Sequence, residues 1–233
     1  AKPRLVAQRI RETKADGVIV YCGEHPESRQ AIAAVVEAGV PAICLTTDMP
    51  GSPRFAYVGI DHTKAGRTAG FITAKMARRA GTVIALTHGM GYRAHKERLA
   101  GFQAGLAAHE PGIELAEILK HHDDSDRAYR LVVQALRRRA DLVALYNTGG
   151  ANRAVAAAIC DQGLAGTLLF LGHELTDASA RLLQEGVMTA TIDQAPELQA
   201  RRSIDLMLSR LGVLASGSSS GEIPFTLHTR ENV

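Results

Sequence analysis

Cysteine is scarce in this sequence. The 233 residues include three cysteines, Cys22, Cys44 and Cys160, each set in an apolar run far from the other two. An odd number of widely spaced thiols indicates neither a disulfide framework nor a zinc site. We therefore expect three buried thiols, for which a reducing cytoplasm is the more suitable compartment.

Long apolar runs are also missing. No stretch approaches the roughly 18 apolar residues that a membrane span needs. The opening residues, AKPRLVAQRIRETK, lack the apolar core of a secretory signal. The sequence therefore predicts neither a membrane span nor export, and a cytoplasmic location. Because the chain opens inside an amphipathic helix, as a truncated chain would, a lost signal would leave no trace.

A strong charge imbalance is absent too. Lys and Arg number 27 against 24 Asp and Glu, a net charge of +3. This balance gives no broad basic surface for a nucleic-acid backbone. We do not expect this segment to bind DNA by itself. With 46% hydrophobic residues, it can bury one large core or two smaller ones.

Short apolar runs alternate with amphipathic segments almost from end to end, which is typical of α/β folds with parallel sheets. The predicted strands are 17–22, 42–46, 56–60, 82–87, 113–119, 142–146, 167–172, 187–192 and 224–229. The predicted helices are 26–38, 64–79, 92–108, 125–139, 151–162, 177–184 and 196–211. We expect Ser125 and Asp177 as N-caps, Gly39, Gly163 and Gly212 as helix stops, and a flexible connection at 215–221.

Motifs for catalysis and cofactor binding are not found. No serine lies in a G-x-S-x-G turn, and the glycine-containing loops 89–94 and 147–152 match neither the P-loop nor the dinucleotide spacing. We predict no catalytic residue, no cofactor and no enzyme activity. His121, His122, Asp123 and Asp124 could suggest a metal, but adjacent side chains diverge, and a polar turn before the next helix explains them. We predict no metal site.

Polar side chains gather at or near the predicted strand ends, where open α/β sheets bind ligands. Carboxylates, amides and one arginine suit hydrogen bonds to a polyhydroxylated molecule, although each alone could be a helix cap or turn. Tyr21, Tyr92 and Tyr146 could offer aromatic faces to a sugar ring, or be ordinary core residues. The set is Glu24, His25, Thr46, Asp61, Arg98, Asn147, Glu174 and Gln194.

Several longer segments share the order of motifs in one family. They include DGVIVYCGEHPESRQAI (16–32), AYVGIDHTKAGRTAG (56–70), YRAHKERLAGFQAGL (92–106), LYNTGGANRAVAAAI (145–159) and TATIDQAPELQARRSIDLML (189–208). In these segments the chain resembles the type I periplasmic-binding-protein fold. Sugar-import receptors and lactose-repressor (LacI/GalR) family transcription regulators share that fold.

The resemblance implies two doubly wound parallel-sheet lobes with a ligand cleft between them. It places residues 1–63 and 193–221 in the N-terminal lobe and residues 64–192 and 222–233 in the C-terminal lobe, with crossings near 61–65, 191–195 and 220–223. Family members begin with a β-α-β unit that this chain lacks, and regulators add a helix-turn-helix headpiece. Without that unit the N-terminal lobe would have a costly unpaired sheet edge, so we expect the whole protein to contain this segment.

The resemblance also implies a ligand site. Arg98 matches the family arginine that holds ligand hydroxyls, Asn147 the strand-end asparagine, and Glu174 a position that is usually aspartate. Gln194 falls in a strand that crosses between lobes, and Thr46 replaces a position that is often acidic. Together with Glu24, His25, Asp61 and Tyr92, these residues form the predicted ligand-binding set. His62 and Thr148 also depart from the common residues.

Two functions from different classes remain. The tail TLHTRENV (226–233) resembles the ending of many regulators, which favours the effector-binding domain of a transcription regulator. In that interpretation a sugar-like effector closes the cleft, and the protein is a homodimer that reaches DNA only through a headpiece absent from this chain. The alternative is a periplasmic sugar-binding receptor of an ABC importer.

Overall fold

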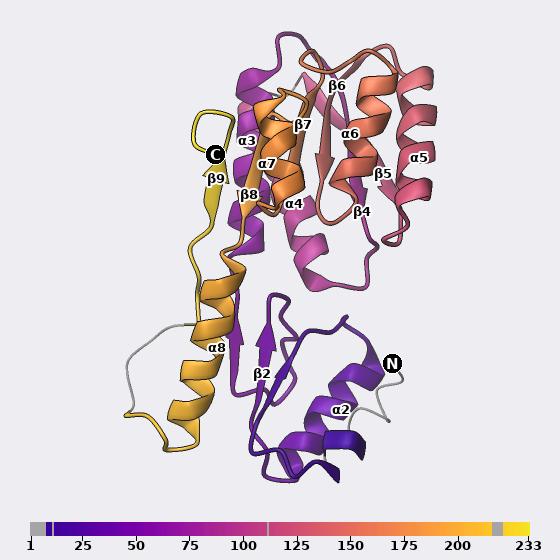
Figure 1. Ribbon diagram of the computed structural model, residues 1–233. Coiled ribbons are helices and arrows are strands. Elements are labelled where there is room, and N and C mark those ends of the chain that lie inside the picture. The colour runs from indigo at the N-terminus through magenta and orange to yellow at the C-terminus, as the bar shows by residue number, and fades with distance from the viewer. Residues whose placement is uncertain (1–7, 11, 111, 216–220) are drawn as a thin grey trace. The chain divides into compact units, whose positions relative to one another are not determined.

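The computed structural model describes residues 8–10, 12–110, 112–215 and 221–233, so the opening residues 1–7 and positions 216–220 of the expected connection lie outside the described residues. Strands and helices alternate along the chain (Figure 1). The strands are β1 (Val18–Val20), β2 (Ala42–Leu45), β3 (Ala56–Val58), β4 (Gly81–Thr87), β5 (Ile113–Lys120), β6 (Leu142–Asn147), β7 (Leu169–His173), β8 (Ala190–Asp193) and β9 (Thr226–His228). The helices are α2 (Pro26–Glu37), α3 (His62–Met76), α4 (Arg93–His109), α5 (Ser125–Arg138), α6 (Asn152–Asp161), α7 (Asp177–Gln184) and α8 (Pro196–Arg210).

Each expected strand and helix is present, so the α/β prediction is confirmed, but two expected N-caps were wrong by one residue. Asp124 caps α5, because its carboxylate accepts from the Arg127 backbone N–H at 2.8 Å, and Ser125 is the first helical residue. Thr176 caps α7 in a reciprocal pair with Ser179, and Asp177 lies inside the helix. A short polar side chain one position earlier reaches the first unpaired amides better.

The expected helix stops are confirmed. Gly39, Gly163 and Gly212 have φ values of 84°, 68° and 74°, and each directly follows the C-cap residue of its helix. Glycine adopts this left-handed backbone without a side-chain penalty.

The chain divides into two compact units. Unit 1 comprises Ala1–Asp61, Gly91–Ala94 and Gln194–Pro224, and unit 2 comprises His62–Met90, His95–Asp193 and Phe225–Val233. The lobe boundaries drawn from the sequence stay a prediction. They differ from these units at Gly91–Ala94 and 222–224, which pack with unit 1, and at 62–63 and Asp193, which pack with unit 2.

Unit 1 contains a parallel three-stranded sheet in the order β1-β2-β3. Helices α2 and α8 both pack on β2. A side chain at Gly17 would overlap Met207 of α8, so glycine permits this close approach. Strand β1 lies at one edge of the sheet, as expected from the sequence.

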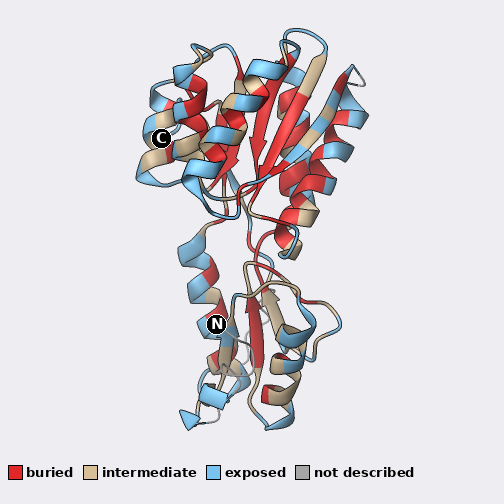
Figure 2. Ribbon diagram, turned by 90° about the vertical axis from the view of Figure 1, so that its right-hand side faces the viewer, coloured by how far each residue is buried: buried red, intermediate tan, exposed pale blue. Residues whose placement is uncertain are grey.

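Unit 2 contains a six-stranded sheet in the order β5-β4-β6-β7-β8-β9, parallel except for the β8–β9 pair. Its central strands are almost wholly buried (Figure 2), and all six residues of β6 are buried. Burial on both faces explains why these strands read as continuous apolar runs.

Helices α3 and α4 of unit 2 touch backbone to backbone. A side chain at Gly66 or Gly70 would overlap the carbonyl oxygens of Arg98 or Phe102, and one at Gly101 or Gly105 would overlap carbonyls of α3. Two glycine pairs, each spaced by four residues, therefore let the helices meet without intervening side chains. This contact brings the start of α3 beside Arg98 on α4.

Among the described helices, none is long and apolar enough to cross a bilayer.

Candidate functional site

Arg98 is the best-defined charged group of the predicted set. It is 3% exposed, its Nε–H donates to His62 Nδ1 at 3.2 Å, and its Nη1 donates to the Thr148 carbonyl oxygen at 2.6 Å. A buried guanidinium needs such partners to offset its desolvation. His62 and Thr148, two of the residues that depart from the family pattern, thus help to fix the orientation of Arg98.

His95 extends this network. Its Nδ1 lies 3.0 Å from Thr148 Oγ1, which donates its single hydrogen to the Leu86 carbonyl at 3.1 Å. In that arrangement the hydroxyl accepts from the Nδ1–H tautomer of His95. Burial, and then the charge of Arg98, lowers the pKa of His95 from 6.5 to about 4. This imidazole is neutral at physiological pH.

Tyr146 and His173 form a second buried polar pair, with the phenol oxygen 2.8 Å from His173 Nε2. Burial raises the pKa of Tyr146. Burial, followed by the charge of Arg98, lowers the pKa of His173 well below its ordinary value. His173 Nδ1 has no hydrogen-bond partner among the described residues. Tyr146 also stacks on Phe102, so its ring is a core residue, one of the two possibilities left open by the sequence.

Asn147 organises the loop that follows β6. Its Nδ2 group donates to the carbonyl of Gly150 at 2.6 Å and to Asn152 Oδ1 at 2.7 Å. Asn152 in turn donates to the His173 carbonyl at 2.9 Å. The amide hydrogens of Asn147 are therefore engaged within the protein, and a direct ligand contact by Asn147 stays a prediction.

Glu174 follows β7 in a left-handed conformation, with φ of 73°. Its N–H donates to the Ile192 carbonyl, and its own carbonyl accepts from Ser179 Oγ at 2.7 Å and Thr191 Oγ1 at 3.1 Å. A non-glycine residue in this conformation is strained, and such strain is typical of functional sites. These three hydrogen bonds fix the backbone of Glu174, and so fix the point from which its carboxylate side chain extends.

In unit 1, Thr46 and Gln194 are joined through Gln199. Thr46, with φ of 63°, donates from Oγ1 to Gln199 Oε1 at 2.8 Å. Gln199 Nε2 donates to the Gln194 carbonyl at 2.8 Å. Gln199 is 2% exposed, so both ends of its amide are satisfied inside unit 1.

Glu24 and His25 have local structural roles. Glu24 lies 3.8 Å from Arg29, and its N–H donates to the Gly91 carbonyl at 2.6 Å. His25 caps α2, since its Nδ1 accepts from the Glu27 N–H at 3.3 Å. Asp61 is half-buried. The structure gives Glu24 and His25 the roles of turn and cap, and their ligand contacts stay predictions.

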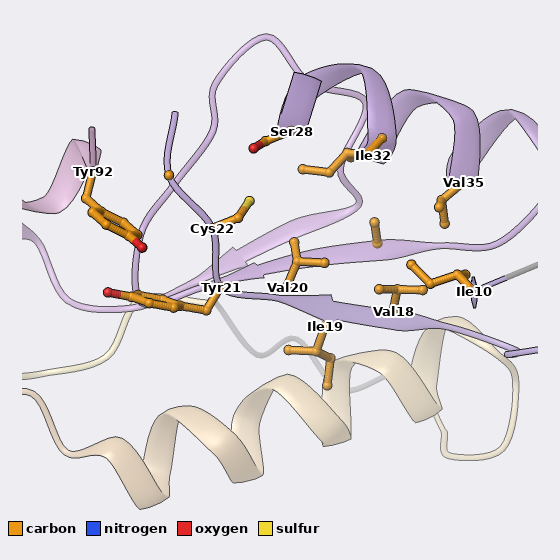
Figure 3. Close-up of a pocket in the computed structure, with 13 residues that line it drawn as sticks. Ile10, Val18, Ile19, Val20, Tyr21, Cys22, Ser28, Ile32, Val35 and Tyr92 are labelled. Atoms are coloured by element: carbon orange, nitrogen blue, oxygen red, sulfur yellow. The ribbon is translucent and has the colours of Figure 1, made fainter. Parts of the chain in front are cut away.

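Tyr92 stacks on Tyr21, with ring centroids 5.3 Å apart and planes inclined by 17°. Figure 3 shows the two rings face to face beside the end of β1. They border a hollow of about 480 Å³ along the β1 edge, whose other walls are mainly aliphatic and come from β1 and α2. The hollow therefore suits apolar groups better than hydroxyls.

The polar turn between β5 and α5 is as expected. His121 Nδ1 accepts from the Asp123 N–H at 3.1 Å, and His88 Nδ1 lies 2.8 Å from Asp123. Across the described ranges, no group of three or more His, Cys, Asp or Glu side chains is arranged to hold a metal ion. The cysteines are unpaired thiols, but Cys160 is exposed and Cys22 half-buried, so the expectation of three buried thiols holds only for Cys44.

Each unit thus holds its own part of the predicted set. Arg98, Asn147 and Glu174 lie in unit 2, whereas Glu24, His25, Thr46, Asp61, Tyr92 and Gln194 lie in unit 1. Sequence reasoning missed His95, which bonds to Thr148 in unit 2, and Gln199, which joins Thr46 to Gln194 in unit 1. The sequence carried no clear signal for Gln199, because it shares the buried face of α8 with Ser203 and Met207, while the apolar Leu198 and Ile204 are exposed.

Comparison with known proteins gives the family. A model described as "Periplasmic binding protein domain" matches residues 4–212. The ABC transporter periplasmic-binding protein YphF of Escherichia coli is 24% identical over 97% of this chain and 70% of its own length. The ribose import binding protein RbsB of Haemophilus influenzae is 30% identical over 72% of this chain, and the match spans 56% of its own length.

Solved structures share the fold. An ABC transporter solute-binding protein from Burkholderia graminis, in complex with D-arabinose, has a TM-score of 0.91 at 22% identity, covering 98% of this chain and 80% of that one. A putative LacI transcriptional regulator from Bacteroides fragilis has a TM-score of 0.85 at 21% identity, with the same coverage. The chain belongs to the periplasmic-binding-protein domain family and has its α/β fold.

Proposed function

We propose that this chain binds a sugar and serves as the solute-binding component of a sugar importer. The relatives support the ligand class, because RbsB is named for ribose import and the Burkholderia neighbour holds D-arabinose. They also favour the importer, the alternative weighed from the sequence, over the regulator. A protein with this role acts outside the cytoplasm, contrary to the location expected from the sequence.

The observation that carries the proposal is the fixed, buried guanidinium of Arg98. Because His62 and Thr148 orient it, its N–H donors are held in place before a ligand arrives, which reduces the entropic cost of binding. Hydroxyl oxygens accept from such donors, and the Glu174 carboxylate accepts from hydroxyl hydrogens. Neutral His95 adds no second charge, so the site suits an uncharged sugar.

Thermal-shift screening with ribose, arabinose, allose, xylose and galactose tests the proposal. We expect at least one of these sugars to stabilise the wild-type protein. Arg98→Ala should weaken its affinity on the order of 100-fold, because a charge-assisted bond is lost. Arg98→Lys keeps the charge but loses the planar guanidinium geometry, and should also weaken the affinity. Arg98 is 3% exposed, so both variants will also be less stable. Each ligand shift is therefore referred to the variant's own melting temperature.

Arg130→Ala is the matched control, because Arg130 is exposed on α5. Its sugar response should equal that of wild type. If a sugar stabilised wild type and both Arg98 variants equally, Arg98 would not contribute to sugar binding. The absence of any sugar response in the wild-type protein would contradict sugar binding itself.

A second candidate is the effector-binding domain of a cytoplasmic, dimeric transcription regulator that reaches DNA through a helix-turn-helix headpiece. The TLHTRENV ending, the three unpaired thiols and the LacI-type structural neighbour favour it. The coding sequence upstream separates the two candidates. A signal peptide supports the importer, and a helix-turn-helix supports the regulator.

A further inference from the structure

Unit 2 contains a second hollow, at the end of its sheet where β6, β7 and β8 begin. Its volume is about 1130 Å³, and its walls come from the end of α3, the starts of those strands, the turn after α7 and the tail after β9. Asn147 and Glu174 lie at the opposite ends of their strands. This groove is therefore separate from the polar network around Arg98.

The groove exposes large apolar side chains. Phe71 is 43% exposed and Met76 is 49% exposed, and both lie on α3. The Phe71 ring is held edge-on against His109, with centroids 4.9 Å apart. Exposed aromatic and methionine side chains in one hollow are typical of protein-binding surfaces, since methionine adapts its shape to a partner.

The rim of the groove is basic. Lys75, Arg78, Arg79 and Arg230 line it, against Glu185 and Glu231. Arg230 lies 3.5 Å from Glu231, an exposed pair of small energetic value. Lys75 and Arg78 form no ion pair with a described carboxylate. Lys75 also suits the C-terminal end of a helix, but Arg78 and Arg230 lie outside any helix.

The walls that carry these charges are fixed by hydrogen bonds. Arg79 donates to the carbonyl oxygens of Ala140 and Leu142, both at 3.2 Å, and so ties the end of α3 to the turn before β6. After β9, the Thr229 N–H donates to Asn232 Oδ1 at 2.7 Å, and Asn232 Nδ2 donates to the Leu227 carbonyl at 3.1 Å. This turn, part of the TLHTRENV tail, places Arg230 at the groove.

We propose that this groove is a docking surface for an acidic segment of a partner protein. An apolar side chain of that segment packs against Phe71 and Met76, and its carboxylates face Lys75, Arg78 and Arg230. Charge complementarity selects an acidic partner, and the exposed apolar side chains supply an anchor. The volume is above the usual range of roughly 300–1,000 Å³ for small-molecule sites, which favours a protein segment.

A fluorescein-labelled peptide of glutamate and leucine, measured by fluorescence anisotropy against the whole chain, is the probe. We expect saturable binding that weakens as salt rises. The double variant Arg78→Glu with Arg230→Glu should bind about tenfold more weakly or worse. Met76→Gln should weaken binding by roughly fivefold through the apolar anchor.

The matched control is Arg130→Glu with Arg153→Glu, two exposed arginines on α5 and α6 that give the same change of net charge. This control should bind the peptide within about twofold of wild type. An equal loss in both double variants would show unspecific attraction and overturn the proposal. So would equal binding of a peptide in which serine replaces leucine.

A basic surface can also bind an anionic membrane. Vesicles of phosphatidylglycerol and phosphatidylcholine test this alternative. Binding of these vesicles through Arg78 and Arg230, without binding of the peptide, would replace the protein partner by a membrane. The sugar response of the Arg78 and Arg230 variants should equal that of wild type. The two proposals therefore succeed or fail independently.

Discussion

The edge strand β1 of unit 1 and the central strand β6 of unit 2 differ strongly in burial. None of the three residues of β1 in unit 1 is buried, whereas all six residues of β6 in unit 2 are. Figure 2 shows the central strands of unit 2 as buried. Strand β1 lies at a sheet edge and β6 lies between β4 and β7. Position within the sheet, and not strand composition, accounts for the difference.

The residues of the predicted site are held differently in the two units. In unit 2, Arg98, His95 and Thr148 are fixed inside the core, where the hydrogen bonds are shielded from water and each lost partner is costly. In unit 1, Glu24 and Tyr92 rest on partly exposed contacts, although Gln199 is buried. We therefore expect changes in unit 2 to cost more stability than changes in unit 1.

The largest expected effect on stability comes from disrupting the close contact between α3 and α4 in unit 2. Gly101→Val should destabilise the protein by roughly 4 kcal/mol, because the new side chain forces α3 and α4 apart. Urea unfolding measures the change. Ala108→Val, at an exposed position of the same helix, should cost about 0.5 kcal/mol. Similar losses in the two variants would contradict the helix contact.

Low pH should reduce the stability of unit 2 more than that of unit 1. The pKa of His95 is lowered to about 4, and the pKa values of His121 and His173 are also lowered, mainly by burial. Unfolding restores ordinary values near 6.5. The unfolded chain therefore binds more protons between about pH 6.5 and 4, and stability falls as pH falls through this window. For His95 alone the loss approaches about 3 kcal/mol.

Hydrogen exchange at neutral pH and near pH 5, corrected for intrinsic rates, measures this acid effect by region. Protection should fall more in unit 2 than in unit 1. His95→Gln removes the titrating group and should reduce the pH dependence of urea unfolding. An unchanged dependence would show that His95 is not responsible.

Gln199→Leu tests the buried link in unit 1. It removes the Gln199 hydrogen bonds to Thr46 Oγ1 and to the Gln194 carbonyl, and should cost roughly 1–3 kcal/mol. Thermal unfolding measures the loss. Glu197→Ala, an exposed change on the same helix, serves as the control. If both variants unfold like wild type, the Gln199 bonds contribute nothing to stability.

The smallest effect concerns the aromatic pair. Tyr21 is 56% exposed, so Tyr21→Ala should cost roughly 0.5–1.5 kcal/mol through the lost stacking on Tyr92. Amide exchange at residues 18–22 should rise, while exchange in β6 should not change. An equal rise in both strands would show that the two sheets do not respond separately.

The apolar pattern of the chain was sufficient to place the strands and helices, because the buried strands are short, nearly continuous apolar runs and the helices repeat apolar residues every three to four positions. It also showed that polar residues follow β6 and β7. It did not show what those residues do locally. The side-chain amide of Asn147 donates its hydrogens within its own loop, and the His25 side chain caps α2. Both follow because nearby backbone groups compete for polar side chains.

The sequence by itself determined the α/β class, the elements and the glycine positions that end helices, because these depend on local propensity and spacing. Only the tertiary structure decided that Arg98 is oriented by His62 and Thr148, that Gln199 joins Thr46 to Gln194, and that basic residues from α3 and the tail line one groove. These contacts join residues far apart in the chain, and local patterns carry no information about such distances.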